Sequence, residues 1–372
     1  MSEGSPDPSP EALTSGDADS KEAAAQRGNA APRRRATPRR SATPSGDGAP
    51  DHVAAPAPVP TLGEAPGAIE VTDDLASAGR KAMWPHVERM LAREARLMDP
   101  DRPDDLRRYR VAIRRLRVGL RMFGGAYPRR DIRMMRRDLS ELADAIGAVR
   151  DLDLRIADLT DWAQERGSGE QEAVAPLLAA WVDARGVALA ELEAHLSSRR
   201  HGRLLVALAN LVAGHDDAAA GGDGGRIGEH LASDTWRRYE AIRGYAAAVR
   251  WADVETLHRL RISVKRLRDG LDLLGDVVGP ARALLTSRLV ALQDHLGALN
   301  DASVTADAVR VFLERRHGGL APATRAAITA YLAERERDVA RRRRSILRVW
   351  RPVAGITFAR RLGRLVVLPL PR

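Results

Sequence analysis

Five arginines recur at helical spacing between residues 106 and 122, and their chemistry is that of an anion site. On a helix that turns by about 100° per residue they fall within about 80° of arc and extend over about 21 Å. The five are Arg107, Arg110, Arg114, Arg117 and Arg121. A guanidinium group can donate two parallel hydrogen bonds to phosphate oxygens. The spacing therefore predicts a continuous site for an elongated, phosphate-rich anion.

Apolar residues flank these arginines on both sides. One strip consists of Tyr109, Ile113, Leu116 and Leu120, and the other of Val111, Val118 and Met122. A solvated charged face normally lies opposite a single apolar stripe, so this layout predicts that the arginines line a groove between packed helices. A later segment repeats the pattern with His258, Arg261, Lys265 and Arg268, with Asp272 at its fifth position. We call the five arginines and these four side chains the cation row.

Two interpretations of the cation row remain open at this point. Like charges so close together repel each other, so the groove must hold water, a bound polyanion or carboxylates of the protein itself. The carboxylates available for such internal neutralisation are Asp138, Glu141, Asp144, Glu191 and Glu193. His258 likewise can bind the anion or satisfy a neighbouring polar group at the start of its helix.

The sequence around the cation row is helical in character from about residue 73 onward, because Ala, Leu, Arg and Glu dominate and β-type alternation is absent. Segment 106–125 matches 257–276, and segment 142–153 matches 292–303, so the chain repeats itself after about 150 residues. We therefore predict an all-α fold of two pseudo-symmetric antiparallel helical bundles. The predicted halves are 73–213 and 229–372, joined by a Gly-rich linker at 214–228.

The positive charge is concentrated in this helical part. The chain has 60 Lys and Arg against 50 Asp and Glu, and residues 71–372 hold 53 against 40 of them. Residues 1–72 are rich in Ala, Pro and Ser, which predicts a disordered tail. The absence of cysteine permits a reducing cytosol, and no run of about 18 uncharged apolar residues is present to predict a membrane span. We expect a cytoplasmic protein with polyanionic partners.

At the residues of the cation row the sequence resembles the CHAD family, the conserved histidine α-helical domain. The motifs that carry the resemblance are "LHRLRISVKRLR" at 257–268, "YRVAIRRLRVGLRMF" at 109–123 and "LADAIGAVRDLDL" at 142–154. The resemblance covers about 73–372 and implies helical bundles around a basic central cavity that binds inorganic polyphosphate, with association with polyphosphate granules. It implies as ligands Arg110, Arg114, Arg117, Arg121, His258, Arg261, Lys265 and Arg268.

The sequence departs from the family pattern at two positions. Arg107 stands where the family has a histidine, which keeps a positive charge there but removes a group that titrates near neutral pH. Asn300 stands where the first repeat has Arg150. The first half is therefore expected to bind anions more strongly than the second.

Function is accordingly predicted as non-catalytic binding of polyphosphate, with no cofactor and no metal site. A nucleic-acid-binding protein is the alternative, although aromatic residues make up only 4% of the chain. A metal-dependent phosphohydrolase is a weaker alternative, because the sequence offers no convergent acidic cluster. The His215-Asp216-Asp217 run lies in the predicted linker, and Asp151 is interpreted as the cap of a helix that starts near it.

Overall fold

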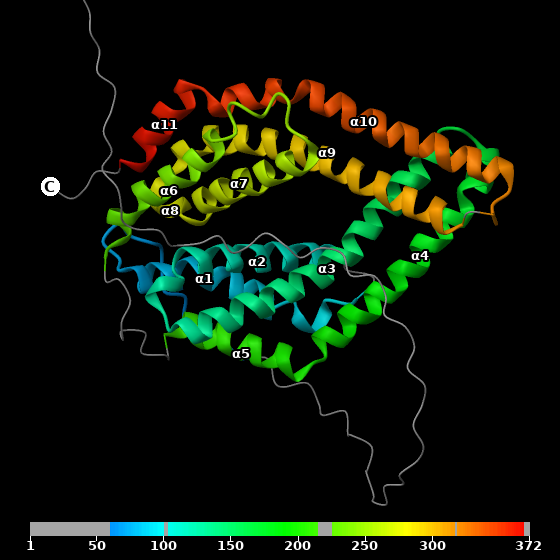
Figure 1. Cartoon of the computed structure of the whole chain (residues 1–372). Helices are drawn as coiled ribbons and strands as arrows, with labels where there is room; N and C mark the ends of the chain where they lie inside the picture. Colours follow the sequence, from blue (N-terminus) through cyan, green and yellow to red (C-terminus); the bar gives the residue numbers. More distant parts are fainter. Residues whose placement is uncertain (1–59, 100–102, 215–224, 317, 368–372) are drawn as a thin grey trace, which may run out of the picture. The chain divides into compact units, whose positions relative to one another are not determined.

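Helices account for most of the described residues in this computed structural model, which describes residues 60–99, 103–214, 225–316 and 318–367 (Figure 1). The first series is α1 (Leu75–Leu91), α2 (Pro103–Met122), α3 (Arg129–Gln164), α4 (Ser168–Leu196) and α5 (Arg199–Ala213). The second is α6 (Ile227–Arg243), α7 (Val254–Leu273), the short α8 (Gly275–Val278), α9 (Ala283–Arg315), α10 (Pro322–Ala354) and α11 (Ile356–Val366). The described ranges contain no β-strand, only an isolated bridge between Asp74 and Arg226. The predicted all-α class is confirmed.

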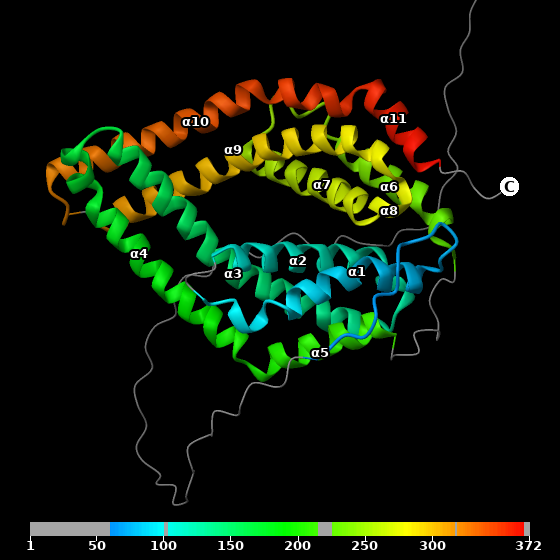
Figure 2. The same ribbon diagram turned by 180° about the vertical axis from the view of Figure 1, so that it is seen from behind.

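The two series of helices have the same order of lengths and contacts. Helices α2 and α7 both have 20 residues, and, apart from the short α8, the next helix after each has more than 30 residues, α3 with 36 and α9 with 33. Helix α3 packs along α4, and α9 packs along α10, as both views show (Figures 1 and 2). This order agrees with the predicted duplication of the sequence, which stays a prediction.

Local sequence signals explain where several helices begin and end. The Asp74 carboxylate accepts hydrogen bonds from the backbone amides of Ala76 and Ser77, both at 2.9 Å, at the start of α1. Asp253 caps α7 in the same way through the amide of Thr256, at 2.7 Å. Gly167, with φ of +105°, directly precedes α4, and glycine adopts this backbone conformation without strain.

Two separate clusters of buried apolar side chains hold the helices together. The main core contains the predicted apolar strip of α2, since Tyr109, Ile113, Leu116 and Leu120 are all buried. On the other flank Val118 is buried, whereas Val111 is exposed. A second core lies where the far ends of α3 and α4 meet those of α9 and α10, and it includes Leu159, Trp162, Trp181, Val309 and Tyr331. The second core therefore fastens the first series of helices to the second at a distance from the main core.

A close approach between α1 and α2 fixes the position of the cation row in the first half. A Cβ atom added to Gly119 would lie 2.5 Å from Cγ of Met83. Only glycine permits this contact, so α1 covers the side of α2 that carries Gly119.

The structure refines three boundaries predicted from the sequence. Ile69, inside the predicted tail 1–72, is buried in the main core, whereas residues 1–59 lie outside the described residues. Helix α6 begins at Ile227, within the predicted linker 214–228, of which residues 215–224 and the His215-Asp216-Asp217 run are likewise outside the description. The prediction that Asp151 caps a helix is wrong, because α3 runs without a break from Arg129 to Gln164 and places Asp151 in its interior.

Candidate anion-binding site

Helices α2 and α7, which carry the two parts of the cation row, pack against each other (Figures 1 and 2). Arg115 of α2 fixes their register, since its guanidinium donates to the Asp272 carboxylate at 2.8 Å and to the carbonyl of Asp269 at 3.2 Å. Asp272, at the fifth position of the second repeat, is thus paired with Arg115, which lies outside the cation row. The row residues on the two helices are thereby brought close together.

Electrostatic effects between the two helices show this proximity. Desolvation lowers the pKa of Arg110, and the positive charges of Arg150 and Arg261 lower it further, against the opposite effect of Asp151 and Asp301. Desolvation also lowers the pKa of Lys265, to about 8, and its further charged neighbours are Asp269, Arg114, Arg261 and Arg117. Since Arg110 and Arg114 belong to α2 while Arg261 and Lys265 belong to α7, the cations of both repeats share one region of electrostatic potential.

One buried carboxylate partly neutralises the cation row. Asp269 is 1% exposed and accepts a hydrogen bond from Nη2 of Arg268 at 2.7 Å. Its other oxygen lies 3.8 Å from Nε of Arg114. Neither contact was foreseen from the sequence, although Asp269 follows Arg268 directly in the chain. Arg114 and Arg268 are therefore already paired within the protein.

The carboxylates suspected from the sequence do not neutralise the row. Asp138 and Glu141 form ion pairs with Arg200 of α5, and Asp138 also pairs with Arg137. No ion pair within the described ranges joins Asp144, Glu191 or Glu193 to a row residue. Among the row residues, Arg114 and Arg268 have ion pairs in the described ranges, and the other seven do not: Arg107, Arg110, Arg117, Arg121, His258, Arg261 and Lys265.

Residues of the cation row border three separate hollows. The first, of about 470 Å³, is lined by His258 and Arg261 together with Asp151, Asp301, Asp158 and Arg335, among other residues. The second, of about 400 Å³, is lined by Arg117 and Arg121 with Arg133, Arg136, Arg137 and Ser140. Arg121 also borders a third hollow, of about 310 Å³, next to α6. A single central cavity, as the resemblance implies, stays a prediction. Arg107 is exposed on α2 and lines none of these hollows.

His258 is held by a neighbour and still faces the first hollow. Its Nδ1 lies 2.7 Å from the side-chain oxygen of Asn300 on α9. Because a side-chain carbonyl oxygen only accepts hydrogen bonds, Nδ1 carries the proton, which leaves Nε2 of the ring available for another partner. Asn300, noted in the sequence only as a departure from Arg150, thus orients the histidine.

The first hollow contains two aspartates close to the row. Desolvation raises the pKa of Asp151, and Asp301 raises it further, whereas Arg155, Arg110 and Arg261 act in the opposite direction. A carboxylate in this position repels a bound anion. The hollow beside His258 is therefore of mixed charge, unlike the hollow beside Arg117.

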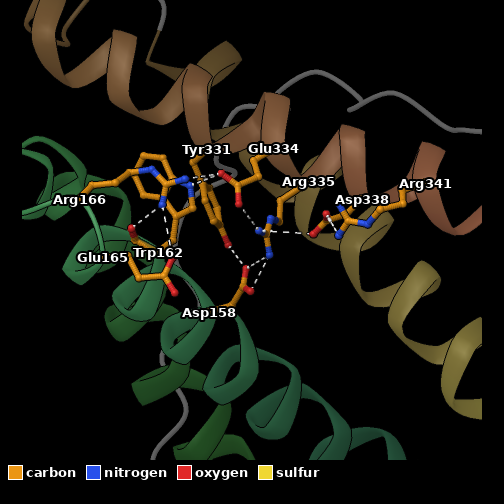
Figure 3. Close-up of polar contacts among 9 residues, drawn as sticks. All are labelled: Asp158, Trp162, Glu165, Arg166, Tyr331, Glu334, Arg335, Asp338 and Arg341. Carbon is orange, nitrogen blue, oxygen red and sulfur yellow. Dashed lines mark hydrogen bonds and ion pairs between the residues drawn. The ribbon is translucent and has the colours of Figure 1, made fainter.

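A network of ion pairs and aromatic rings includes Asp158, Arg335 and Asp338, which also line the first hollow (Figure 3). The carboxylate of Asp158 accepts hydrogen bonds from the Tyr331 hydroxyl at 2.5 Å and from Nη1 of Arg335 at 2.6 Å. The guanidinium of Arg166 lies 4.3 Å from the centre of the Trp162 ring. The two hydrogen bonds of Asp158 join α3 to α10 beside the second core. Because their partners lie 173 and 177 residues apart in the chain, no periodicity could have revealed them.

Two further functional classes can be compared with the structure. Within the described residues there is no group of three or more His, Asp or Glu side chains placed to hold a metal ion. One described helix, α4, is long and apolar enough to cross a membrane, with a mean hydropathy of 1.4 over its most apolar window. A single such helix is weak evidence for a span, and α4 packs against α3 and α10 through Val174, Leu177 and Trp181.

Comparisons with known proteins agree on one family. The model of the CHAD domain family matches residues 81–310. The crystal structure of the CHAD domain from the plant Ricinus communis is similar to 79% of this chain over 97% of its own length, with 22% identity and a TM-score of 0.60. PptA from Streptomyces chartreusis is similar to 75% of this chain over 100% of its own length, with 19% identity and a TM-score of 0.58. At these identities the two structures show a shared fold. No curated protein sequence matches this chain significantly.

Proposed function

This chain belongs to the CHAD family, and we propose that it binds inorganic polyphosphate, without catalysis, along the cation row of α2 and α7. The ligands in this proposal are Arg107, Arg110, Arg114, Arg117, Arg121, His258, Arg261, Lys265 and Arg268. Association with polyphosphate granules in the cytoplasm is part of the same proposal.

The observation that carries the proposal is the convergence of cations that lack internal partners. The positive charge of Arg261 on α7 is one of the causes that lower the pKa of Arg110 on α2, and neither arginine forms an ion pair with a carboxylate of the described chain. Crowded guanidinium groups that are partly removed from water are destabilising unless an anion compensates them. A linear polyphosphate supplies a negative charge on each unit and therefore suits a row of this length.

The chemistry of the row favours a polyphosphate over a nucleic acid. Single-stranded nucleic acids are commonly held by aromatic side chains that stack on bases. The row offers guanidinium, ammonium and imidazole groups, and the aromatic Tyr109 next to it is fully buried. These groups can contact phosphate oxygens, and such contacts do not distinguish one base sequence from another.

A charge-reversal pair tests the proposal. Arg110→Glu with Arg261→Glu should abolish retention of long-chain polyphosphate on the immobilised protein, because two unpaired cations at the contact of α2 and α7 become anions. Arg108→Glu with Arg259→Glu is the matched control: it makes the same change of net charge on exposed positions of the same two helices. Retention should also fall steeply with salt.

The outcomes separate the candidate functions. Wild-type retention by the Arg110→Glu/Arg261→Glu protein, with normal helicity by circular dichroism, would contradict the proposal. If duplex or single-stranded DNA displaced bound polyphosphate at equal phosphate concentration, the nucleic-acid alternative would be favoured. Localisation of the fluorescently tagged protein in cells with and without polyphosphate tests the association with granules.

A further inference from the structure

The hollow between α2 and α3 is built almost entirely of arginines. Arg117 and Arg121 face it from α2, and Arg133, Arg136 and Arg137 face it from the first three turns of α3, with Ser140 beside them. Its volume is about 400 Å³, which lies within the range of about 300–1,000 Å³ that is usual for small-ligand sites. We call it the arginine hollow.

The positive charge of the arginine hollow is barely compensated inside the protein. Within the described ranges, Arg137 is the one arginine of the hollow with an ion pair, to the Asp138 carboxylate, which Arg200 also contacts. No carboxylate in the described ranges pairs with Arg117, Arg121, Arg133 or Arg136. Desolvation lowers the pKa of Arg121 to about 10, and the next largest causes are the charges of Arg117, Arg266, Arg136 and Arg238. Guanidinium groups that are this crowded repel one another unless an anion, either a counterion in the solvent or a bound ligand, compensates their charge.

The hollow also contains a hydroxyl that is oriented for an anion. Nη2 of Arg117 donates to Oγ of Ser140 at 3.2 Å. The hydroxyl therefore acts as an acceptor toward Arg117, and its own proton remains available to an oxygen of a ligand. Guanidinium groups from two helices together with one hydroxyl are the donors that phosphate groups require.

At the offset of 150 residues that relates α3 to α9, the sequence of the second half does not repeat the arginines that α3 contributes to the hollow. At the repeat offset of about 150 residues, Arg133, Arg136 and Arg137 correspond to Ala283, Thr286 and Ser287, and Arg121 corresponds to Asp272. The arginines of α3 are therefore an addition of the first half to the pattern that the two repeats share.

We propose that the arginine hollow is a second anion site, which takes a short linear phosphate such as the end of a polyphosphate chain. This inference rests on the proposed function and deepens it, since the hollow adjoins the cation row at Arg117 and Arg121. The end group of such a chain carries more negative charge than an internal unit, because its second acidic oxygen ionises near neutral pH. The densest group of unpaired cations therefore selects the end over the middle of the chain.

Calorimetric titration of the full chain with inorganic tripolyphosphate tests this site. Arg133→Gln with Arg136→Gln removes two exposed, unpaired cations of the hollow and should weaken binding at least about tenfold, as expected for lost hydrogen bonds between charged groups. Arg129→Gln with Arg130→Gln is the matched control, on exposed positions of the same helix outside the hollow, and should change the affinity less than about twofold.

The results distinguish this inference from the proposed function. Unchanged affinity for tripolyphosphate in Arg133→Gln/Arg136→Gln, or an equal loss in the control, overturns the arginine hollow as a site. Retention of long-chain polyphosphate that depends on Arg110 and Arg261 would then leave the proposed function standing. Conversely, tripolyphosphate binding that requires Arg133 and Arg136, without any retention of long chains, would leave the hollow as a site and contradict the function of the row.

Discussion

The α2–α3 region and the α7–α9 region have related sequences, but the cations of the two regions have different surroundings. Beside α2, Arg117 and Arg121 open into a hollow of further arginines. Beside α7, the counterpart of Arg117 is Arg268, which is buried against Asp269, and the adjoining hollow contains Asp151 and Asp301. Equivalent cations thus border an open hollow in one region and lie against a buried carboxylate in the other. The difference agrees with the expectation that the first half binds anions more strongly.

The largest effect is expected when the internal partner of the second region is removed. Asp269→Asn leaves the buried guanidinium of Arg268 without a counter-charge, and breaking a buried ion pair costs about 3–5 kcal/mol. The free energy of unfolding, measured by urea denaturation, should fall by that amount. Asp272→Asn, at a more exposed carboxylate paired with Arg115, should cost about 1 kcal/mol. Equal losses in the two variants would show that Asp269 has no special role.

A pH dependence of intermediate size is expected at Lys265. Its pKa of about 8 lies below the usual 10.5, because desolvation and the neighbouring arginines disfavour the charged form. Affinity for polyphosphate should therefore fall several-fold as the pH rises through about 8, since one cation of the row is lost. The stability contribution has the opposite sign: the cost of the charged ammonium is fully present below pH 8 and disappears as the pH rises toward 10.5.

Lys265→Arg provides the control for this titration. A guanidinium stays charged well above pH 10, so the variant should lose the decline of affinity between pH 7.5 and 9. Calorimetry in buffers of different ionisation enthalpy should also detect proton uptake by the wild type near pH 8. A decline that persists unchanged in the variant would assign the titration to another group.

The smallest effect is expected at the amide that orients His258. Asn300→Ala removes the acceptor of the hydrogen bond from Nδ1, which lets the ring rotate and should weaken polyphosphate binding about threefold. The stability should change little because both side chains are only partly buried. If affinity fell as far as in Arg110→Glu/Arg261→Glu, the mixed-charge hollow would be the dominant part of the site, and the comparison of the two regions would be reversed.

Much of this arrangement could be predicted from local sequence patterns. The spacing of Arg110, Arg114, Arg261 and Lys265 places them correctly on two helices, because helical periodicity is fixed by backbone geometry. The apolar strip of α2, consisting of Tyr109, Ile113, Leu116 and Leu120, is buried as predicted.

What could not be predicted depends on which helices meet. Asp269 could have been identified as a partner by its place next to Arg268, but Arg114 joins it only through the packing of α2 on α7. Arg133 and Arg136 belong to a basic run of α3. The sequence does not show that they line the same hollow as Arg117, because this depends on how α3 packs beside α2. The pairing of Asp158 with Arg335 links residues 177 positions apart, and no local rule specifies such a contact.

The contacts at the second core should keep the two series of helices associated even if the backbone between them is cleaved. Asp158 and Tyr331 lie at the far end of α3 and α10, whereas the backbone connection between the two series of helices lies between α5 and α6. If one peptide bond between Gly214 and Gly225 were cleaved, the two fragments should therefore stay associated. The contacts that would hold them together are those of Asp158 and the Trp162 ring with α10, and the packing of α2 on α7. Such a nicked molecule should migrate as one species until denaturant separates it, and it should keep its ligand.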